Sequence, residues 1–149
     1  MTRFSLDANI LVYAADLAAG ERHERALEIL DRAVRRDCVL TLQALAEFFH
    51  VTTRKRLVPR TDAAVQVRDW ATGFPIVTAE PGALLAALEF AVDGRFGWWD
   101  ALLLATAEQH GCKVVLSEDM QDGAQLGDVT VLDPFVGEEL PERVAGLLR

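Results

Sequence analysis

Short apolar runs alternate along this chain with longer segments in which apolar residues recur every three or four positions. The runs that predict strands are residues 4–6, 38–40, 113–116 and 129–132, and a run at 74–77 fits either a short strand or an extended link. Helices are predicted after residue 7 and over residues 21–36, 42–56, 61–71, 83–92, 101–110 and 141–148. Short, uniformly apolar strands that alternate with helices indicate an α/β fold with a mostly parallel sheet covered on both faces.

The helix predicted over residues 42–56, for which Thr41 is a reasonable N-cap, carries two stripes. Its core stripe on a helical wheel consists of Leu42, Leu45, Ala46 and Phe49. A polar stripe beside it, at the same spacing, consists of Gln43, Glu47, His50 and Arg54. Such a stripe is usually a solvated face, although Glu47 borders the predicted core.

Three aspartates stand where a purely structural role is an incomplete explanation. Asp7 and Asp119 come just after apolar strands, at the edge where parallel sheets bind ligands. Asp100 shares a helical stripe with Leu103, Leu104 and Ala107. A carboxylate on such a face is costly to bury unless it is capped, paired or bound to a cation. Each has an alternative role as a helix cap or a first-turn acid, so the suggestion of a site rests on their combination with Glu47.

Composition and net charge argue against some classes of function. The 149 residues fit one domain, 1–149, and their formal net charge of −8 argues against binding nucleic acid by overall basicity. Nucleic acid stays open as a substrate, because metal ions and a local basic patch offset acidic side chains. The apolar runs are too short to span a bilayer and no leader precedes the first strand, so we expect a cytoplasmic protein with no membrane partner.

Carboxylates are the chain's main candidate ligands, since it has two cysteines and three scattered histidines. We expect Cys38 and Cys112 to be small buried residues and not a disulfide. Oxygen-only ligands suit the hard cations Mg²⁺ and Mn²⁺. Such cations activate water and clamp a scissile phosphate, so the acids fit phosphodiester hydrolysis.

The order of these residues resembles the PIN domain, in particular the VapC toxin type of bacterial toxin–antitoxin pairs. The matching stretches are Asp7-Ala8-Asn9 with the apolar helix after it, Glu47, Trp99-Asp100 with residues 101–105, Ser117-Glu118-Asp119, and Asp133-Pro134-Phe135. The resemblance spans nearly the whole chain. It implies a three-layer α/β/α sandwich and metal-dependent endoribonuclease activity.

The resemblance also implies residue roles. The acids that hold one or two Mg²⁺ or Mn²⁺ ions and act in catalysis are Asp7, Glu47, Asp100 and Asp119. Supporting residues are Asn9, Ser117 and, in a looser alignment, Asp122. The chain departs from the family pattern at Gly97, where a serine often stands, and at Asp133, where asparagine is more frequent. Neither departure removes a metal ligand; each bears on a supporting hydrogen bond.

The implied partners are an RNA substrate and a small VapB-like antitoxin that covers the active site. The chain would form a homodimer, or a heterotetramer or larger assembly with the antitoxin. Positive charge for RNA is expected from Arg54, Lys55 and Arg56 and from Arg95, which precedes Asp100. The alternative for the first three is a solvated helix end, which basic residues also favour.

Two other functions stay open. A Mg²⁺-dependent phosphatase or receiver-like α/β domain also places an aspartate at a strand end, but it would call for an Asp-x-Asp pair or a late strand-end lysine. The other is a catalytically silent PIN-like binding module in which the acids serve as caps and salt-bridge partners.

Overall fold

The central sheet of the protein has four strands, as seen in a computed structural model that describes residues 1–149. Its strands, in spatial order, are β1 (Phe4–Leu6), β4 (Val114–Leu116), β6 (Val129–Leu132) and β5 (Gln125–Leu126). The first three are parallel, with Leu6 beside Leu116 and Leu116 beside Leu132, while β5 runs antiparallel to β6. The carboxyl ends of β1, β4 and β6 therefore meet at one edge.

A smaller parallel sheet extends the central one on the side of β1. It consists of β2 (Leu40–Thr41) and β3 (Ile76–Val77). A single parallel bridge between Phe4 and Cys38 joins it to β1. Because this bridge is also parallel, Thr41 at the end of β2 lies on the same side as the ends of β1 and β4.

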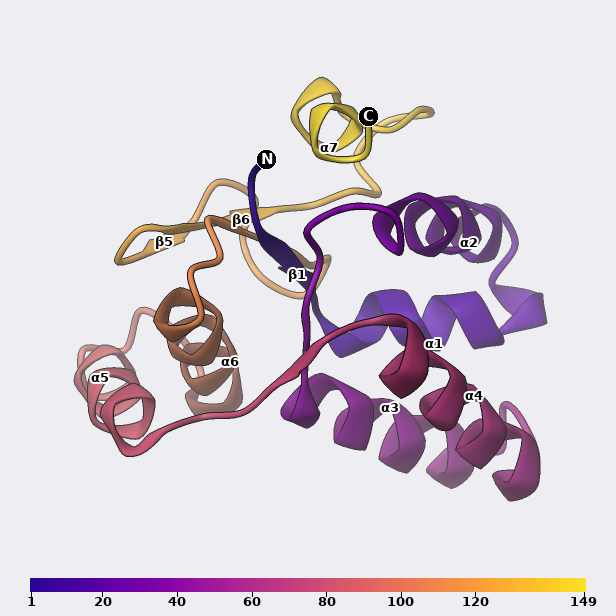
Figure 1. Ribbon diagram of the computed structural model, residues 1–149, viewed down its shortest axis with the longest axis horizontal. Helices are drawn as coiled ribbons and strands as arrows, with labels where there is room; N and C mark the ends of the chain where they lie inside the picture. Colours follow the sequence, from indigo (N-terminus) through magenta and orange to yellow (C-terminus); the bar gives the residue numbers. More distant parts are fainter.

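Seven α-helices surround the strands: α1 (Ala8–Ala15), α2 (Glu21–Ala33), α3 (Leu42–Arg54), α4 (Arg60–Gly73), α5 (Pro81–Val92), α6 (Trp98–Gln109) and α7 (Glu142–Leu147). Figure 1 shows α7 on one face of the sheet and α6, backed by α5, on the other. Helices α1 to α4 form a second group, in which α1 packs on α2 and α3, and α3 packs on α4. This is the expected α/β/α sandwich, so the predicted fold class is confirmed.

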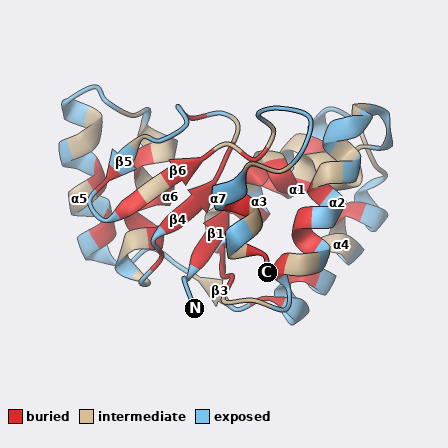
Figure 2. Ribbon diagram, turned by 90° about the horizontal axis from the view of Figure 1, so that it is seen from above, coloured by how far each residue is buried: buried red, intermediate tan, exposed pale blue.

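The core lies between the sheet and the helices that cover it, as the buried residues in Figure 2 show. Every residue of β1 and β4 is buried, which explains why these strands are uniformly apolar or nearly so. Cys38 and Cys112 are buried as free thiols, as predicted. None of the helices is both long and apolar enough to cross a bilayer.

The elements depart from the sequence-based prediction in a few places. Two segments that the sequence assigns to no strand or helix contain one: residues 16–20 contain a 3₁₀ turn, η1 (Leu17–Ala19), and β5 precedes the strand predicted at 129–132. Helix α6 begins at Trp98, three residues earlier than predicted, and α2 ends at Ala33, three residues earlier. The run at 74–77 supplies a strand, but only as the two residues of β3.

The predicted core stripe of α3 is correct at Leu45 and wrong at its other three positions. The buried residues of this helix are Ala44, Leu45, Phe48 and Thr52, whereas Leu42 is 55% exposed, Phe49 is 38% exposed and Ala46 is exposed. Apolar residues occur around most of the helix, so periodicity alone could not choose the inward face. The packing partner decides it, because Phe48 meets the Trp70 ring of α4 edge-on at 4.7 Å. Thr52 is buried because its hydroxyl donates to the Phe48 carbonyl.

The neighbouring phenylalanines of α3 provide a matched test of this packing. We expect Phe48→Ala to lower the free energy of unfolding by about 3–5 kcal/mol, because it leaves a cavity beside Trp70. Phe49→Ala removes the same atoms from a partly exposed position and should cost about 1 kcal/mol or less. Urea unfolding of the two variants measures both values. An equal loss of unfolding free energy in the two variants would support the predicted core stripe, which contains Phe49.

Candidate active site

Asp7 stands between β1 and α1 and is the most buried acidic residue of the site, with 5% of its surface exposed. Its backbone N–H donates to the Leu116 carbonyl at 2.9 Å, which fixes it beside the end of β4. Its carboxylate Oδ1 accepts from the Ala8 backbone N–H at 2.7 Å, so Asp7 is also the N-cap of α1. The cap and the candidate site are thus the same residue, and Oδ1 still has a second lone pair for a further partner.

Ser117 and Asn9 hold the other carboxylate oxygen of Asp7. The Ser117 hydroxyl donates to Oδ2 at 2.8 Å, and Asn9 Nδ2 lies 3.3 Å from Oδ2 and 3.1 Å from the hydroxyl. In turn Asn9 Oδ1 accepts from the Glu118 N–H, and Ser117 Oγ accepts from the Asp119 N–H. The three side chains therefore connect the end of β1 to the turn after β4.

The turn that carries Asp119 is also held from outside the acidic cluster. Glu118 accepts from the Tyr13 hydroxyl at 2.5 Å and from Arg22 Nε at 2.8 Å, and Arg22 forms an ion pair with it. The Tyr13 ring packs edge-on against Phe135 at 5.2 Å. Burial acts to raise the pKa of Glu118, but hydrogen bonds from Arg22 and Tyr13 outweigh it and lower the pKa. Glu118 thus stays ionised and anchors the turn to α1 and α2.

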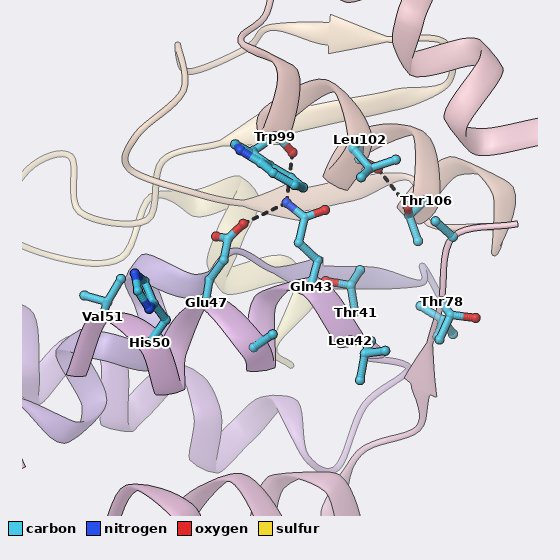
Figure 3. A pocket seen from close by; sticks show the side chains of 13 residues that line it. Thr41, Leu42, Gln43, Glu47, His50, Val51, Thr78, Trp99, Leu102 and Thr106 are labelled. Carbon is cyan, nitrogen blue, oxygen red and sulfur yellow. Dashed lines mark hydrogen bonds between the residues drawn. The ribbon is translucent and has the colours of Figure 1, made fainter. Parts of the chain in front are cut away.

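Gln43 joins the helix of Glu47 to the helix of Asp100. Its Nε2 donates to Glu47 Oε1 at 2.8 Å and to the Trp99 carbonyl at 3.0 Å (Figure 3). Thr41 caps α3 as predicted, its hydroxyl accepting from the Ala44 N–H. The start of α3 is thereby fixed to β2, and Glu47 is fixed relative to the first turn of α6.

Asp100 lies in that first turn and is half-buried. Its stripe partners Leu103, Leu104 and Ala107 are fully buried, as the pattern predicted. The N-cap position is Gly97, which offers no side-chain hydrogen bond to the helix. Asp100 therefore lies at the start of α6, on the helix face whose later positions are buried, without the polar neighbour that a serine at 97 would supply.

The pKa shifts of Asp7 and Asp100 show that the charges of the four predicted acids affect one another's sites. Burial raises the pKa of Asp7 to about 6; the hydrogen bonds from Ser117 and Ala8 oppose this, and the charges of Glu47 and Asp100 add to it. Burial also raises the pKa of Asp100, with further contributions from Asp119 and Glu47. The charge of Glu47 thus acts on both Asp7 and Asp100, that of Asp100 on Asp7, and that of Asp119 on Asp100. The four acids share one electrostatic environment, although they come from two helices and from the ends of two strands.

The donor set fits a hard divalent cation in its chemistry, because it offers only carboxylate oxygens with an unfavourable surplus of negative charge. As placed, no three of the His, Cys, Asp and Glu side chains lie close enough together to hold one ion between them directly. Mg²⁺ usually keeps several of its waters and needs only one or two carboxylates from the protein. The residues therefore fit an ion held partly through water.

Asp122 is engaged elsewhere. Its Oδ1 accepts from the Asp133 backbone N–H at 2.9 Å, at the end of β6. Asp133 in turn accepts from the Phe135 N–H at 2.8 Å and so orders the Asp-Pro-Phe turn. The looser alignment of Asp122 is consistent with this position, in which it supports the edge of the sheet.

The predicted basic residues fall into two groups. Arg54, Lys55 and Arg56 are exposed at the end of α3, on the helix that carries Glu47, and take part in no ion pair. Arg95 instead pairs with Asp93 at 3.0 Å and lies over the Phe90 ring. The first group is free to meet a phosphate, whereas Arg95 is already partnered.

Two contacts of the site were not predicted from the sequence. The Arg22–Glu118 pair joins residues 96 positions apart, and no local pattern marks it. Gln43 was assigned only to a polar stripe. Its i, i+4 spacing to Glu47 was a usable signal, but its second bond, to the Trp99 carbonyl, depends on tertiary packing.

The raised pKa of Asp7 predicts a pH-dependent stability in the metal-free protein. The folded state keeps the Asp7 proton up to about pH 6, whereas the unfolded state releases it near its ordinary pKa of 3.8. The free energy of unfolding therefore falls as pH rises through this window, by about 3 kcal/mol. We expect Asp7→Asn to lose this part of the dependence of the unfolding free energy on pH. Urea unfolding in EDTA between pH 4 and 7 measures it. The exposed Asp31→Asn serves as the control, and a slope unchanged in Asp7→Asn would contradict the assignment.

Comparison with solved structures shows the same fold in proteins from several bacteria. VapBC2 from Rickettsia felis, bound to a promoter DNA fragment, has a TM-score of 0.65 at 12% identity, covering 89% of this chain and 98% of that chain. Mycobacterium tuberculosis VapC20, described as a sarcin-ricin loop cleaving toxin, has a TM-score of 0.65 at 16% identity over 85% and 98%. FitAcB from Neisseria gonorrhoeae has a TM-score of 0.60 at 19% identity over 89% and 99%. At these identities the likeness is one of fold.

Family membership rests on the sequence. No individually curated protein matches it. The family model described as PIN domain matches residues 5–121, a span that contains Asp7, Glu47, Asp100 and Asp119. The match covers most of the chain, and it confirms the resemblance drawn from the acidic residues and their context. The chain belongs to the PIN domain family.

Proposed function

We propose that this protein is a metal-dependent endoribonuclease and the toxin of a type II toxin–antitoxin pair. The observation that carries the proposal is the shared electrostatic environment of Asp7, Glu47, Asp100 and Asp119 at the carboxyl edge of the sheet. Family membership and the toxins among the similar folds support it. The proposed cofactor is Mg²⁺ or Mn²⁺.

In this proposal each part of the chain has a defined task. A bound Mg²⁺ or Mn²⁺ supplies an activated water and offsets charge on the scissile phosphate. Ser117 and Asn9 fix the Asp7 carboxylate by hydrogen bonds, so its oxygens need no reorientation when an ion arrives. Gln43 does the same for Glu47. The raised pKa values of Asp7 and Asp100 mean that ion binding also releases protons, so affinity should rise with pH.

The proposed partners follow from the same comparison. Similar folds include complexes described as VapBC and as a toxin–antitoxin complex from Klebsiella pneumoniae, so we propose a small antitoxin partner for this chain. A basic antitoxin segment would complement the net charge of −8. Helix α5 exposes Leu84, Leu85 and Leu88, which suits an interface of the proposed homodimer or larger assembly. Its RNA substrate and antitoxin would place it in the cytoplasm.

One observation favours a second candidate, the catalytically silent binding module. The acids are not gathered into a direct three-residue metal site, and Asp7 serves as a helix cap. The phosphatase or receiver-like alternative has less support, since Ala8 and Asn9 follow Asp7 and supply no second acid. Metal binding and cleavage assays separate the nuclease from the silent module.

Incubation of the pure protein with total RNA tests the nuclease. We expect cleavage with Mg²⁺ or Mn²⁺ and none with EDTA, and a loss of at least about 100-fold in Asp100→Asn, which removes a charge from the ion's environment. Calorimetry should show Mn²⁺ binding that weakens in the same variant. Asp31→Asn is the surface control. Cleavage that persists in EDTA, or Mn²⁺ binding that is equal in Asp100→Asn, would reject the proposal.

Charge reversal tests the basic end of α3. In Arg54→Glu/Arg56→Glu we expect weaker binding of single-stranded RNA and a shallower salt dependence, with the slope reduced by about 1.4 for two lost phosphate contacts. Fluorescence anisotropy over a range of salt concentrations measures both. The matched control is Arg35→Glu, an exposed arginine after α2. An unchanged affinity and slope would assign Arg54 and Arg56 to a solvated helix end.

A further inference from the structure

A groove of about 930 Å³ opens directly beside the candidate active site, between α3, α6 and the segment after β3. Glu47 lies on its wall, and Trp99, the residue before Asp100, forms part of its side (Figure 3). Its apolar lining includes Leu42, Val77 and Leu102. Its volume is in the range of pockets that bind small organic molecules.

The charge of the lining restricts what can occupy the groove. Glu47 is the only ionisable residue on the wall apart from His50, and no lysine or arginine lines it. A phosphate would meet a carboxylate there without a compensating cation from the protein. A neutral, flat and partly apolar group meets no such penalty. Of the parts of an RNA chain, this description fits the base and excludes the backbone.

Trp99 provides the surface on which such a base would lie. Its side chain is 62% exposed, although its backbone carbonyl is fixed by the Gln43 amide at 3.0 Å. Large aromatic side chains are usually more buried than this. Proteins that bind unpaired RNA stack its bases on exposed aromatic rings, because every base presents an aromatic face. The ring also sits next in sequence to a proposed catalytic acid, as a positioning platform should.

Gln43, on the same wall, fixes the backbone of Trp99. Its Nε2 is identified by two acceptor partners, Glu47 Oε1 and the Trp99 carbonyl, so the opposite atom of the amide is the oxygen. That oxygen is buried and has no hydrogen-bond donor. Because it is closed to solvent, a ligand in the groove meets the apolar lining and the Trp99 ring and not this oxygen.

We propose that this groove is a base-recognition subsite, in which an unpaired nucleobase of the RNA stacks on Trp99 against the apolar lining of the groove. The subsite rests on the proposed ribonuclease function and extends it, since it would select single-stranded RNA and place the adjoining phosphate at the acids. Trp99 is here a positioning residue. The RNA phosphates outside the groove would be contacted by the basic end of α3.

The test compares RNA that has bases with RNA that lacks them. Fluorescence anisotropy in EDTA, where no metal-dependent cleavage occurs, gives the affinity of the full chain for labelled hexauridylate and for a six-unit abasic ribose-phosphate chain. We expect hexauridylate to bind about 5- to 100-fold more tightly, as one stacked base provides. Trp99→Ala should abolish this difference, and Trp99→Phe, which keeps a ring, should retain most of it.

Matched controls separate stacking from damage to the fold. Val92→Ala shortens an apolar side chain that is 87% exposed and lies outside the groove, and should leave both affinities unchanged. The chain has three tryptophans, so hexauridylate should quench part of the intrinsic fluorescence in the wild type and none of that part in Trp99→Phe. Thermal unfolding confirms that each variant is folded.

Two results would overturn the subsite. If Trp99→Ala weakens the abasic chain as much as hexauridylate, the ring does not bind a base. If hexa-arginine quenches Trp99 and hexauridylate does not, the groove receives a protein segment. Neither result bears on cleavage, which is measured separately with metal. If the protein cleaves RNA but shows either result, only the subsite proposal is rejected. If it stacks bases but never cleaves RNA, only the nuclease proposal is rejected.

Discussion

The structure depends on keeping a nearly buried carboxylate, that of Asp7, at the end of its first strand. Such a group is costly to bury without partners, and the chain supplies them from three places: the Ala8 amide, Asn9 and Ser117. Even so, burial and the neighbouring acids keep its pKa near 6. The fold therefore disfavours the ionised form of Asp7, and a bound cation would remove this cost. This cost links the architecture to the proposed metal-dependent chemistry.

Parallel topology makes that concentration of charge possible. Because β1, β4 and β6 run in the same direction, the turns after them meet at one edge of the sheet, and the bridge from Phe4 to Cys38 brings the end of β2 to that edge. The helices that follow then carry Glu47 and Asp100 toward the same point. Gln43 and the Glu118–Arg22 pair fix these elements to one another. The same arrangement leaves the groove of Trp99 open beside the acids.

Much of the fold and site could be read from the sequence because its signals are local. Uniformly apolar strands, the Thr41 cap and the position of Asp7 after a strand depend on near neighbours, and the structure has them as expected. The inward face of α3 could not be predicted, since it depends on Trp70 of another helix. The same holds for β5, a two-residue strand defined by its pairing with β6, and for Glu118 as the partner of Arg22.

The bond between Ser117 and Asp7 joins residues 110 positions apart, and this has a consequence for the chain as it is made. A ribosome adds roughly 5–20 residues per second, so Asp7 leaves it roughly 5–20 seconds before its partner. During that interval β1 has no β4 beside it and the acidic cluster has no closing turn. The site is therefore assembled late, when most of the polypeptide has emerged, and a nascent chain holds its acids apart until then.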